Sequence, residues 1–215
     1  MEETVIRKYK AADRSSVRDI AWETAFIGEP ADIFFSGKDI LADFLTLYFT
    51  DYEPQSCFVA ENKTGVVGYL IGAKNTAVLY RIFLNKILAR LLYKFIFQAA
   101  IFRKKNLIFI FHFLCSFSKF EFRMVDLSED YPATMHINIK QRFRNLGIGS
   151  RLISAYFDYL RAEKVKSVYL ATLSEKAAAF FMSHGFNLLY SYPRSYFKYI
   201  LGRDLTGYIY GKKLI

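Results

Sequence analysis

The spacing of apolar residues changes repeatedly along this chain, and that change constrains the fold more than any other feature. Residues 4–13 alternate between apolar and polar side chains, which is the period of a β-strand. Residues 147–163 instead place apolar side chains three and four positions apart, as in a helix with one buried face. Strands are expected at 4–13, 57–61, 66–73, 133–140, 166–172, 186–192 and 206–215, and helices at 13–26, 37–49, 77–97, 147–163 and 174–185. This order predicts an α/β (α+β) layer fold on a mixed sheet.

The composition is that of one globular domain over residues 1–215. Of the 215 residues, 53% are hydrophobic, which excludes a disordered chain. Two isolated cysteines and three scattered histidines show no metal-ligand spacing, so no metal site is expected. The charged N-terminus lacks the apolar core of a signal peptide, which favours a cytoplasmic protein.

Positive charge is concentrated in one segment. Residues 74–123 hold ten Lys and Arg and one acid, Glu121, so this segment accounts for nine of the ten net positive charges. It also holds 12 Phe and Tyr residues. Its longest run without a charged side chain, residues 106–118, is shorter than the roughly 20 residues that a membrane-spanning helix needs.

Residues 74–132 are therefore treated as a basic aromatic insertion within the domain, and several functions remain open for it. It could form a helical lid over the domain, or residues 77–120 could contact an anionic membrane surface as a peripheral element. An exposed apolar face could also produce a homodimer. Nucleic-acid binding is not expected, because the aromatic side chains are too dense and no RNA-binding motif is present.

A helix start at residues 144–151 has the features of an anion-binding site. The first turn of a helix has unpaired N–H groups and a partial positive charge, which can hold a phosphate. Gly147 and Gly149 leave the backbone clear of side chains, while Arg144 and Arg151 add positive charge. The alternative is structural: Gly147 as a turn residue and Gly149 as a close contact with the sheet.

The pattern Arg144-Asn-Leu-Gly147-Ile-Gly149 resembles the Q/R-x-x-G-x-G/A pyrophosphate motif of the GNAT superfamily of N-acyltransferases. The resemblance implies a mostly antiparallel seven-stranded sheet, helices on both faces, and an insertion between the third and fourth strands. It also implies acetyl-CoA as cosubstrate, with its pantetheine paired to the backbone of Ile137 and Ile139. Its pyrophosphate would contact the loop residues Arg144, Asn145, Leu146, Gly147, Ile148, Gly149 and Ser150.

The segment SEKAAAFFMSHGF at 174–186 is similar to the family pattern N-x-x-A-x-x-x-Y-x-x-x-G-F. The resemblance places Ser174, Ala177 and Phe181 at the cofactor. Ser174 stands where Asn is usual, and Phe181 stands where a Tyr often protonates the thiolate. Three stretches, at 20–35, 52–73 and 131–153, are further similar to bacterial GNAT proteins related to the C-terminal acetyltransferase-like domain of O-GlcNAcase.

Transfer of the acetyl group requires a base that removes a proton from the attacking amine. Glu29 and Asp32 in the loop GEPAD are the first candidates, followed by Glu53 and then His136. Tyr190 and Tyr192 are candidate replacements for the missing acid. We therefore expect an N-acetyltransferase that acts on an unidentified small-molecule or peptide amine in a ternary complex. A CoA-binding protein without turnover and a membrane-surface module on the same fold are the alternatives.

Overall fold

The computed structural model describes residues 3–122 and 126–214, and the strands within these ranges form one seven-stranded sheet in the order β1-β2-β3-β4-β5-β7-β6. Strands β4 and β5 pair in parallel, and the other neighbouring strands pair antiparallel. The mixed, mostly antiparallel sheet expected from the sequence is therefore confirmed. The strands are β1 (Val5–Lys8), β2 (Phe58–Asn62), β3 (Gly65–Ala73), β4 (Ala133–Ile139), β5 (Ser167–Thr172), β6 (Asn187–Arg194) and β7 (Leu205–Lys213).

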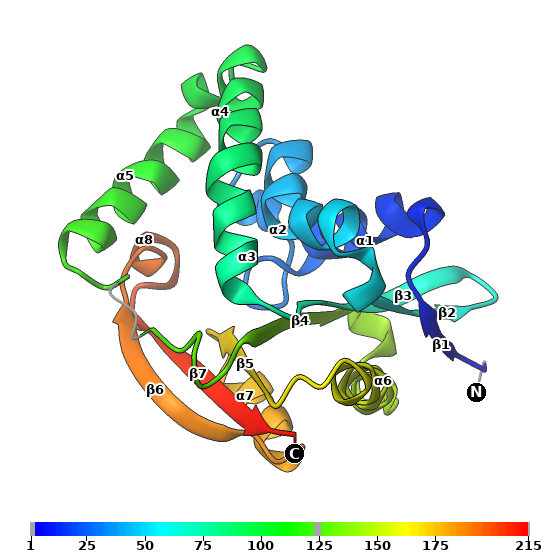
Figure 1. The fold of residues 1–215 in the computed structure, drawn as a ribbon. Coiled ribbons are helices and arrows are strands. Elements are labelled where there is room, and N and C mark those ends of the chain that lie inside the picture. The colour runs from blue at the N-terminus through cyan, green and yellow to red at the C-terminus, as the bar shows by residue number, and fades with distance from the viewer. Residues whose placement is uncertain (1–2, 123–125, 215) are drawn as a thin grey trace.

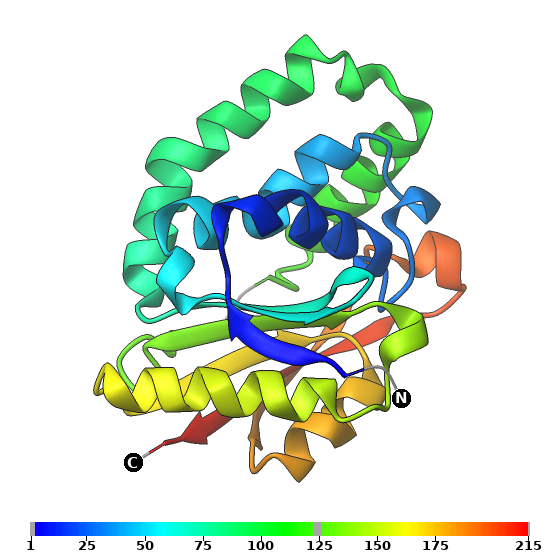
Figure 2. The same ribbon diagram turned by 90° about the vertical axis from the view of Figure 1, so that its right-hand side faces the viewer.

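Helices cover both faces of this sheet, as Figures 1 and 2 show. Helices α6 and α7 lie on one face, named here the α6 face. Helices α1 and α2 and the helices between β3 and β4 lie on the other, named the α2 face. The described α-helices are α1 (Arg14–Thr24), α2 (Lys38–Tyr52), α3 (Thr76–Ile82), α4 (Leu88–Phe97), α5 (Lys104–Ser118), α6 (Ile148–Ala162), α7 (Glu175–Ser183) and α8 (Lys198–Leu201).

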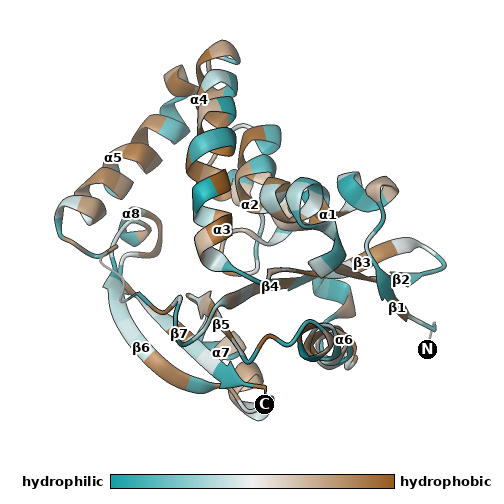
Figure 3. Cartoon of the chain, viewed as in Figure 1, coloured by the Kyte–Doolittle hydropathy of each residue, from teal (hydrophilic) through white to brown (hydrophobic). Residues whose placement is uncertain are grey.

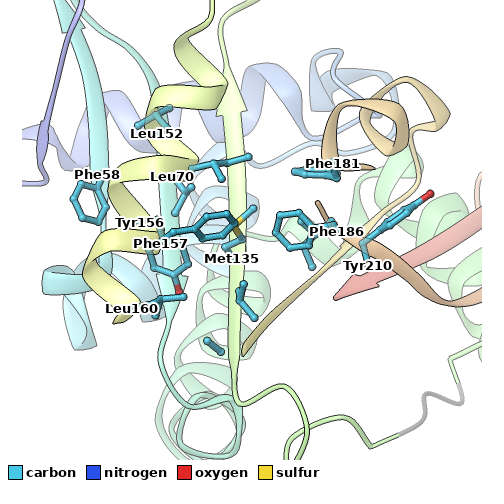
Figure 4. Packing of buried hydrophobic residues seen from close by; sticks show 14 of the residues in the cluster. Phe58, Leu70, Met135, Leu152, Tyr156, Phe157, Leu160, Phe181, Phe186 and Tyr210 are labelled. Carbon is cyan, nitrogen blue, oxygen red and sulfur yellow. The ribbon is translucent and has the colours of Figure 1, made fainter. Parts of the chain in front are cut away.

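The core on the α6 face explains the helical period at residues 147–163. The predicted stripe of α6 is buried, and Leu152, Tyr156 and Leu160 are fully enclosed. They pack against strand residues such as Leu70 and Met135 (Figure 4). A Cβ atom at Gly72 of β3 would lie 2.2 Å from the Tyr156 hydroxyl, so the strand needs glycine where α6 crosses it.

Two apolar clusters fill the α2 face. In the first, α1 and α2 pack on β3, with Ile20 and Leu47 against Tyr69. The second joins the α1–α2 loop to the segment between β6 and β7 through Phe34 and Phe197, whose rings are 5.0 Å apart. This second cluster fixes the loops that lie above the carboxyl end of β4.

The segment between β3 and β4 is helical, as expected. A π-helical turn, Phe83–Ile87, joins α3 to α4, and α5 returns towards the sheet (Figure 1). Fully buried Asn106 of α5 anchors the return, because its side chain bonds both the N–H and the C=O of Ser36 at 2.6 and 2.7 Å.

The basic residues of the α3–α4 helix differ in their surroundings: Arg81 and Arg90 are exposed, whereas Lys86 and Lys94 contact α2. Lys94 forms an ion pair at 2.5 Å with Asp43 of α2, which is 1% exposed, and Lys86 lies over the Tyr52 ring. The side of α4 that carries Lys94 therefore faces α2. Apolar Leu92 and Tyr93 are left exposed instead.

Candidate functional site

Strands β4 and β5 form residue pairs only at Ala133 and Thr134 of β4. Burial changes along β4 near the point where this pairing ends. Residues 133–135 are buried, His136 is exposed, and residues 137–139 are half-buried. A strand in the centre of the sheet therefore has an accessible edge beside β5.

The backbone of β4 offers hydrogen-bonding groups along this edge. On the other side β4 stays paired with β3 through Ile139, and the N–H of Lys140 donates to Val67 of β3 at 2.9 Å. The residues that bond a partner strand alternate in an antiparallel pair. The backbone groups of Ile137 and Ile139 therefore point away from β3 and towards the unpaired edge.

The loop after β4 connects the end of this unpaired edge with the start of α6. Asn145 and Gly147 both have left-handed backbone conformations, with φ of 62° and 74°. Gly147 is the N-cap residue, and no atom of another residue would lie within 4 Å of a Cβ atom placed there. The first N–H groups of α6, including those of Ile148 and Ser150, have no partner within their own helix. The space at Gly147 and the dipole of a 15-residue helix fit a phosphate group.

Gly149 has a different environment. A Cβ atom there would lie 2.8 Å from Cζ of Phe180 in α7, so this glycine permits close packing of the two helices. Ile148 beside it is 2% exposed and points its side chain into the core. Only the backbone of these two residues is available to a ligand.

The arginines of the motif hold the loop in place. Arg144 donates from Nε to the C=O of Ile139 at 3.0 Å and from Nη2 to the C=O of Gly28 at 2.7 Å. It thereby ties the end of β4 to the α1–α2 loop. Arg151 donates to the C=O of Thr4 at 2.7 Å. Asn145 and Leu146 are exposed between them.

The structure separates the four candidate bases. Glu29 and Asp32 have exposed side chains on the α1–α2 loop. Glu53 is 7% exposed and accepts hydrogen bonds from the Tyr48 and Ser56 hydroxyls and from the N–H of Lys74. These three donors satisfy both carboxylate oxygens. Glu53 therefore joins α2 to the end of β3, and its carboxylate is not free to accept a proton from an amine.

His136 lies on the α2 face of β4, next to the first backbone group of the unpaired edge. Its ring meets Phe49 edge-on, with centroids 5.6 Å apart. The side chain is open to solvent, yet the surrounding protein partly desolvates it and lowers its pKa below the usual 6.5. The lowered pKa favours the neutral imidazole, which can accept a proton.

The resemblance placed three residues in and before α7 at the cofactor, and in the structure they have structural contacts. The Ser174 hydroxyl accepts from the N–H of Ala177 at 3.3 Å, as the N-cap of α7. Phe181 is 6% exposed and packs edge-on against Phe186, with ring centroids 5.8 Å apart. No hydroxyl group stands at this position.

Sequence patterns gave no signal for Arg194, at the end of β6. It is 5% exposed, and its guanidinium lies 3.9 Å from the Tyr192 ring centre and 4.3 Å from that of Phe122. Its Nη1 has no hydrogen-bond partner, and no carboxylate of residues 3–122 or 126–214 forms an ion pair with it. Glu121 stands next to Phe122 in the sequence, but its carboxylate accepts hydrogen bonds from Ser116 and Ser195.

Comparison with known proteins gives a consistent picture. The model of the Acetyltransferase (GNAT) family matches residues 15–186. Among curated proteins, no sequence matches. A structure described as SsHAT is similar over 99% of both chains, with 20% identity and a TM-score of 0.74. A Drosophila melanogaster polyamine N-acetyltransferase that forms N-acetylagmatine is similar over 98% of this chain and all of its own, with 14% identity and a TM-score of 0.61. A phosphinothricin acetyltransferase from Sinorhizobium meliloti, in complex with acetyl-CoA, covers 98% of this chain and 88% of its own at 17% identity and a TM-score of 0.57.

Proposed function

The chain belongs to the GNAT family of acetyltransferases, and we propose that it transfers an acetyl group from acetyl-CoA to an amine by direct attack in a ternary complex. One observation carries this proposal. The unpaired backbone edge of β4, at Ile137 and Ile139, continues into the open N-terminus of α6 at Gly147. The edge can pair with the amide groups of a pantetheine arm, and the helix start can hold its pyrophosphate.

The same edge supplies the electrostatic part of the chemistry. When the amine nitrogen bonds to the thioester carbon, negative charge develops on the carbonyl oxygen. A fixed N–H aimed at that oxygen stabilises the transition state more than the ground state. We assign the N–H of Ile139 to this role, because its C=O is already held by Arg144 and the residue is thereby fixed.

We assign His136 as the general base. Only a neutral amine can attack, so a proton must leave the nitrogen, directly or through one water. Among the four candidates, His136 alone lies on β4, and desolvation lowers the pKa of its imidazole, which favours the neutral form. The C–S bond then breaks and the thiolate leaves. A thiolate is stable enough to leave without a dedicated acid, which is compatible with Phe181.

Phe181 also supports a second candidate function, a CoA-binding protein without turnover. Its ring is committed to core packing, and the Ser174 oxygen is used as a helix cap. Release of free thiol from acetyl-CoA, measured over an amine panel, separates the two functions. An enzyme releases thiol only when an acceptable amine is present.

For the acceptor, we favour an amine that also carries an acidic group, or one linked to a lipid. Arg194 packs on the Tyr192 and Phe122 rings and has no carboxylate partner among residues 3–122 and 126–214, and an acidic group on the acceptor would supply that counter-charge. Matched amines that differ only in one carboxylate test this idea. Preference for the acidic member, lost in Arg194→Gln while acetyl-CoA affinity is kept, is the expected result.

The resemblance to the bacterial group related to the O-GlcNAcase acetyltransferase-like domain is likewise proposed, on the three quoted stretches. A homodimer remains a prediction, which light scattering on the purified protein can check.

The pyrophosphate site is tested by a charge placed at the helix start. Gly147→Glu sets a carboxylate against the expected phosphates, and repulsion between like charges of this kind costs several kcal/mol. Acetyl-CoA should therefore bind at least about a hundredfold more weakly by titration calorimetry.

Gly202→Glu is the matched control for this variant. Gly202 has φ of 70°, and it too has no atom within 4 Å of a Cβ position. Both variants therefore suffer similar backbone strain, but only one meets the ligand. Wild-type affinity in Gly147→Glu, or equal losses in the two variants, would overturn the assignment.

A further inference from the structure

Exposed apolar side chains are concentrated on the insertion. Of the 22 large apolar residues that are exposed in the described chain, 14 lie between Tyr80 and Phe120. Phe97 and Phe102, on either side of the turn between α4 and α5, are 76% and 79% exposed. Ordinary scattered exposure does not produce such a density over one helical hairpin.

The inner sides of both helices are already occupied. Leu91 of α4 packs in the α1–α2 cluster, and Phe109 of α5 contacts Phe34 and Phe197, at ring distances of 4.9 and 5.9 Å. The exposed side chains are therefore separate from these packed ones. Figure 3 shows that both α4 and α5 contain hydrophobic (brown) stretches. We define the outer face of the insertion as Leu92, Tyr93, Ile96, Phe97, Ile101, Phe102, Leu107, Phe111 and Leu114.

Within residues 62–120, every charged side chain is positive. No acidic residue occurs between Glu61 and Glu121 in the sequence. Exposed Arg103 and Lys104 follow Phe102 directly, and exposed Arg90 lies near the other end of the face. An apolar surface edged by cations is complementary to a layer of acyl chains under anionic headgroups.

We propose that the outer face of the insertion rests on an anionic lipid bilayer, with Phe97 and Phe102 buried among the headgroups. A second copy of the chain is a poorer occupant, because two outer faces would bring their basic rims together in a protein of net charge +10. The contact is interfacial: no helix in residues 3–122 and 126–214 is long and apolar enough to cross a bilayer. This proposal does not depend on the acetyl site.

Vesicle flotation of the full chain tests the proposal. We expect binding to phosphatidylcholine vesicles that contain phosphatidylglycerol, little binding to phosphatidylcholine alone, and weakening by salt. F97N/F102N removes apolar groups without changing charge, and R103Q/K104Q removes charge without changing apolar groups. Each should lower the partition coefficient roughly tenfold.

M182N/L188N is the matched control, because both residues are exposed apolar side chains outside the insertion, at 53% and 50%. It should float as the wild type does, and all variants should keep wild-type circular dichroism and acetyl-CoA affinity. Three outcomes would overturn the proposal: no flotation of the wild type, equal flotation of F97N/F102N, or a wild-type dimer that F97N/F102N dissociates without any lipid binding.

Discussion

Gly147 and Gly149 look equivalent in the sequence but have different surroundings in the structure. Gly147 adopts a left-handed conformation and faces open space, so it suits a helix start that binds a ligand. Gly149 is buried under the Phe180 ring and is needed for helix packing. The structural interpretation therefore applies to Gly149, although its close contact is with α7 rather than with the sheet, and ligand binding at Gly147 stays a prediction.

The pH dependence of acetyl transfer is a prediction for His136. Because desolvation lowers the pKa of this imidazole, its neutral form persists below pH 6.5. The acid limb of kcat/KM should therefore have its midpoint below 6.5, with activity lost as pH falls through that midpoint. His136→Gln should lower kcat by about 10² to 10⁴-fold and remove this limb.

Glu29→Gln and Asp32→Asn serve as controls in the same assay, and both should keep the acid limb. Acetyl-CoA affinity should be unchanged in all three variants, since none of these side chains lies in the loop after β4. If Glu29→Gln or Asp32→Asn removed the limb while His136→Gln kept it, the base would be the loop carboxylate.

At the scale of elements, one buried carboxylate joins three helices. Asp43 of α2 forms ion pairs with Arg18 of α1 and with Lys94 of α4. Asp43→Asn would leave these cations without their shared partner. Arg18 keeps its ion pair with Asp39 and Lys94 is partly exposed, so the free energy of unfolding in urea should fall by about 1–3 kcal/mol.

Asp19→Asn provides the comparison for this prediction. Asp19 also forms an ion pair with a lysine, Lys38 at 2.7 Å, but both side chains are about half exposed. Exposed pairs contribute about 0–1 kcal/mol, so this variant should unfold nearly as the wild type does. Equal effects of the two substitutions would contradict the role given to Asp43.

Helices and strands whose apolar residues recur with a clear period could be predicted from the sequence. Elements whose position depends on contacts with distant residues could not. The helices predicted at 147–163 and 174–185 correspond to α6 and α7, and the apolar side of α6 is buried as expected. Helix α8 is one turn of four residues, too short for a periodic signal. The ion pair of Lys94 with Asp43 was not predictable, because it requires α2 to lie beside α4.

For the whole molecule, the insertion is part of the domain's core. It contributes buried Ile87 and Leu91 to one cluster and Ala100 to the other. Phe95 and Phe109 pack on the second cluster as well. Full burial of a large apolar side chain contributes about 1.5–3 kcal/mol, so Ile87 and Leu91 alone are a sizeable contribution beside the roughly 5–15 kcal/mol by which a domain is stable.

Deletion of residues 77–120 is therefore expected to prevent folding of the domain, not merely to remove a lid from an otherwise intact domain. Near-ultraviolet circular dichroism and gel filtration of the deletion variant check this expectation. A soluble variant with native spectra would show that the domain is stable without the insertion.

The sequence by itself determined the fold class, the glycine-rich helix start and the separate basic aromatic segment. Each of these is a local pattern of period, backbone freedom or charge. The tertiary structure alone decided which edge of β4 is unpaired, that Glu53 is fully bonded, and that Arg194 is buried with no ion-pair partner in the described part of the chain. It also decided which side of α4 and α5 remains exposed. These properties depend on contacts between residues that are far apart in the chain. The burial and hydrogen bonding of a residue are set by its neighbours in space, which the local sequence does not specify.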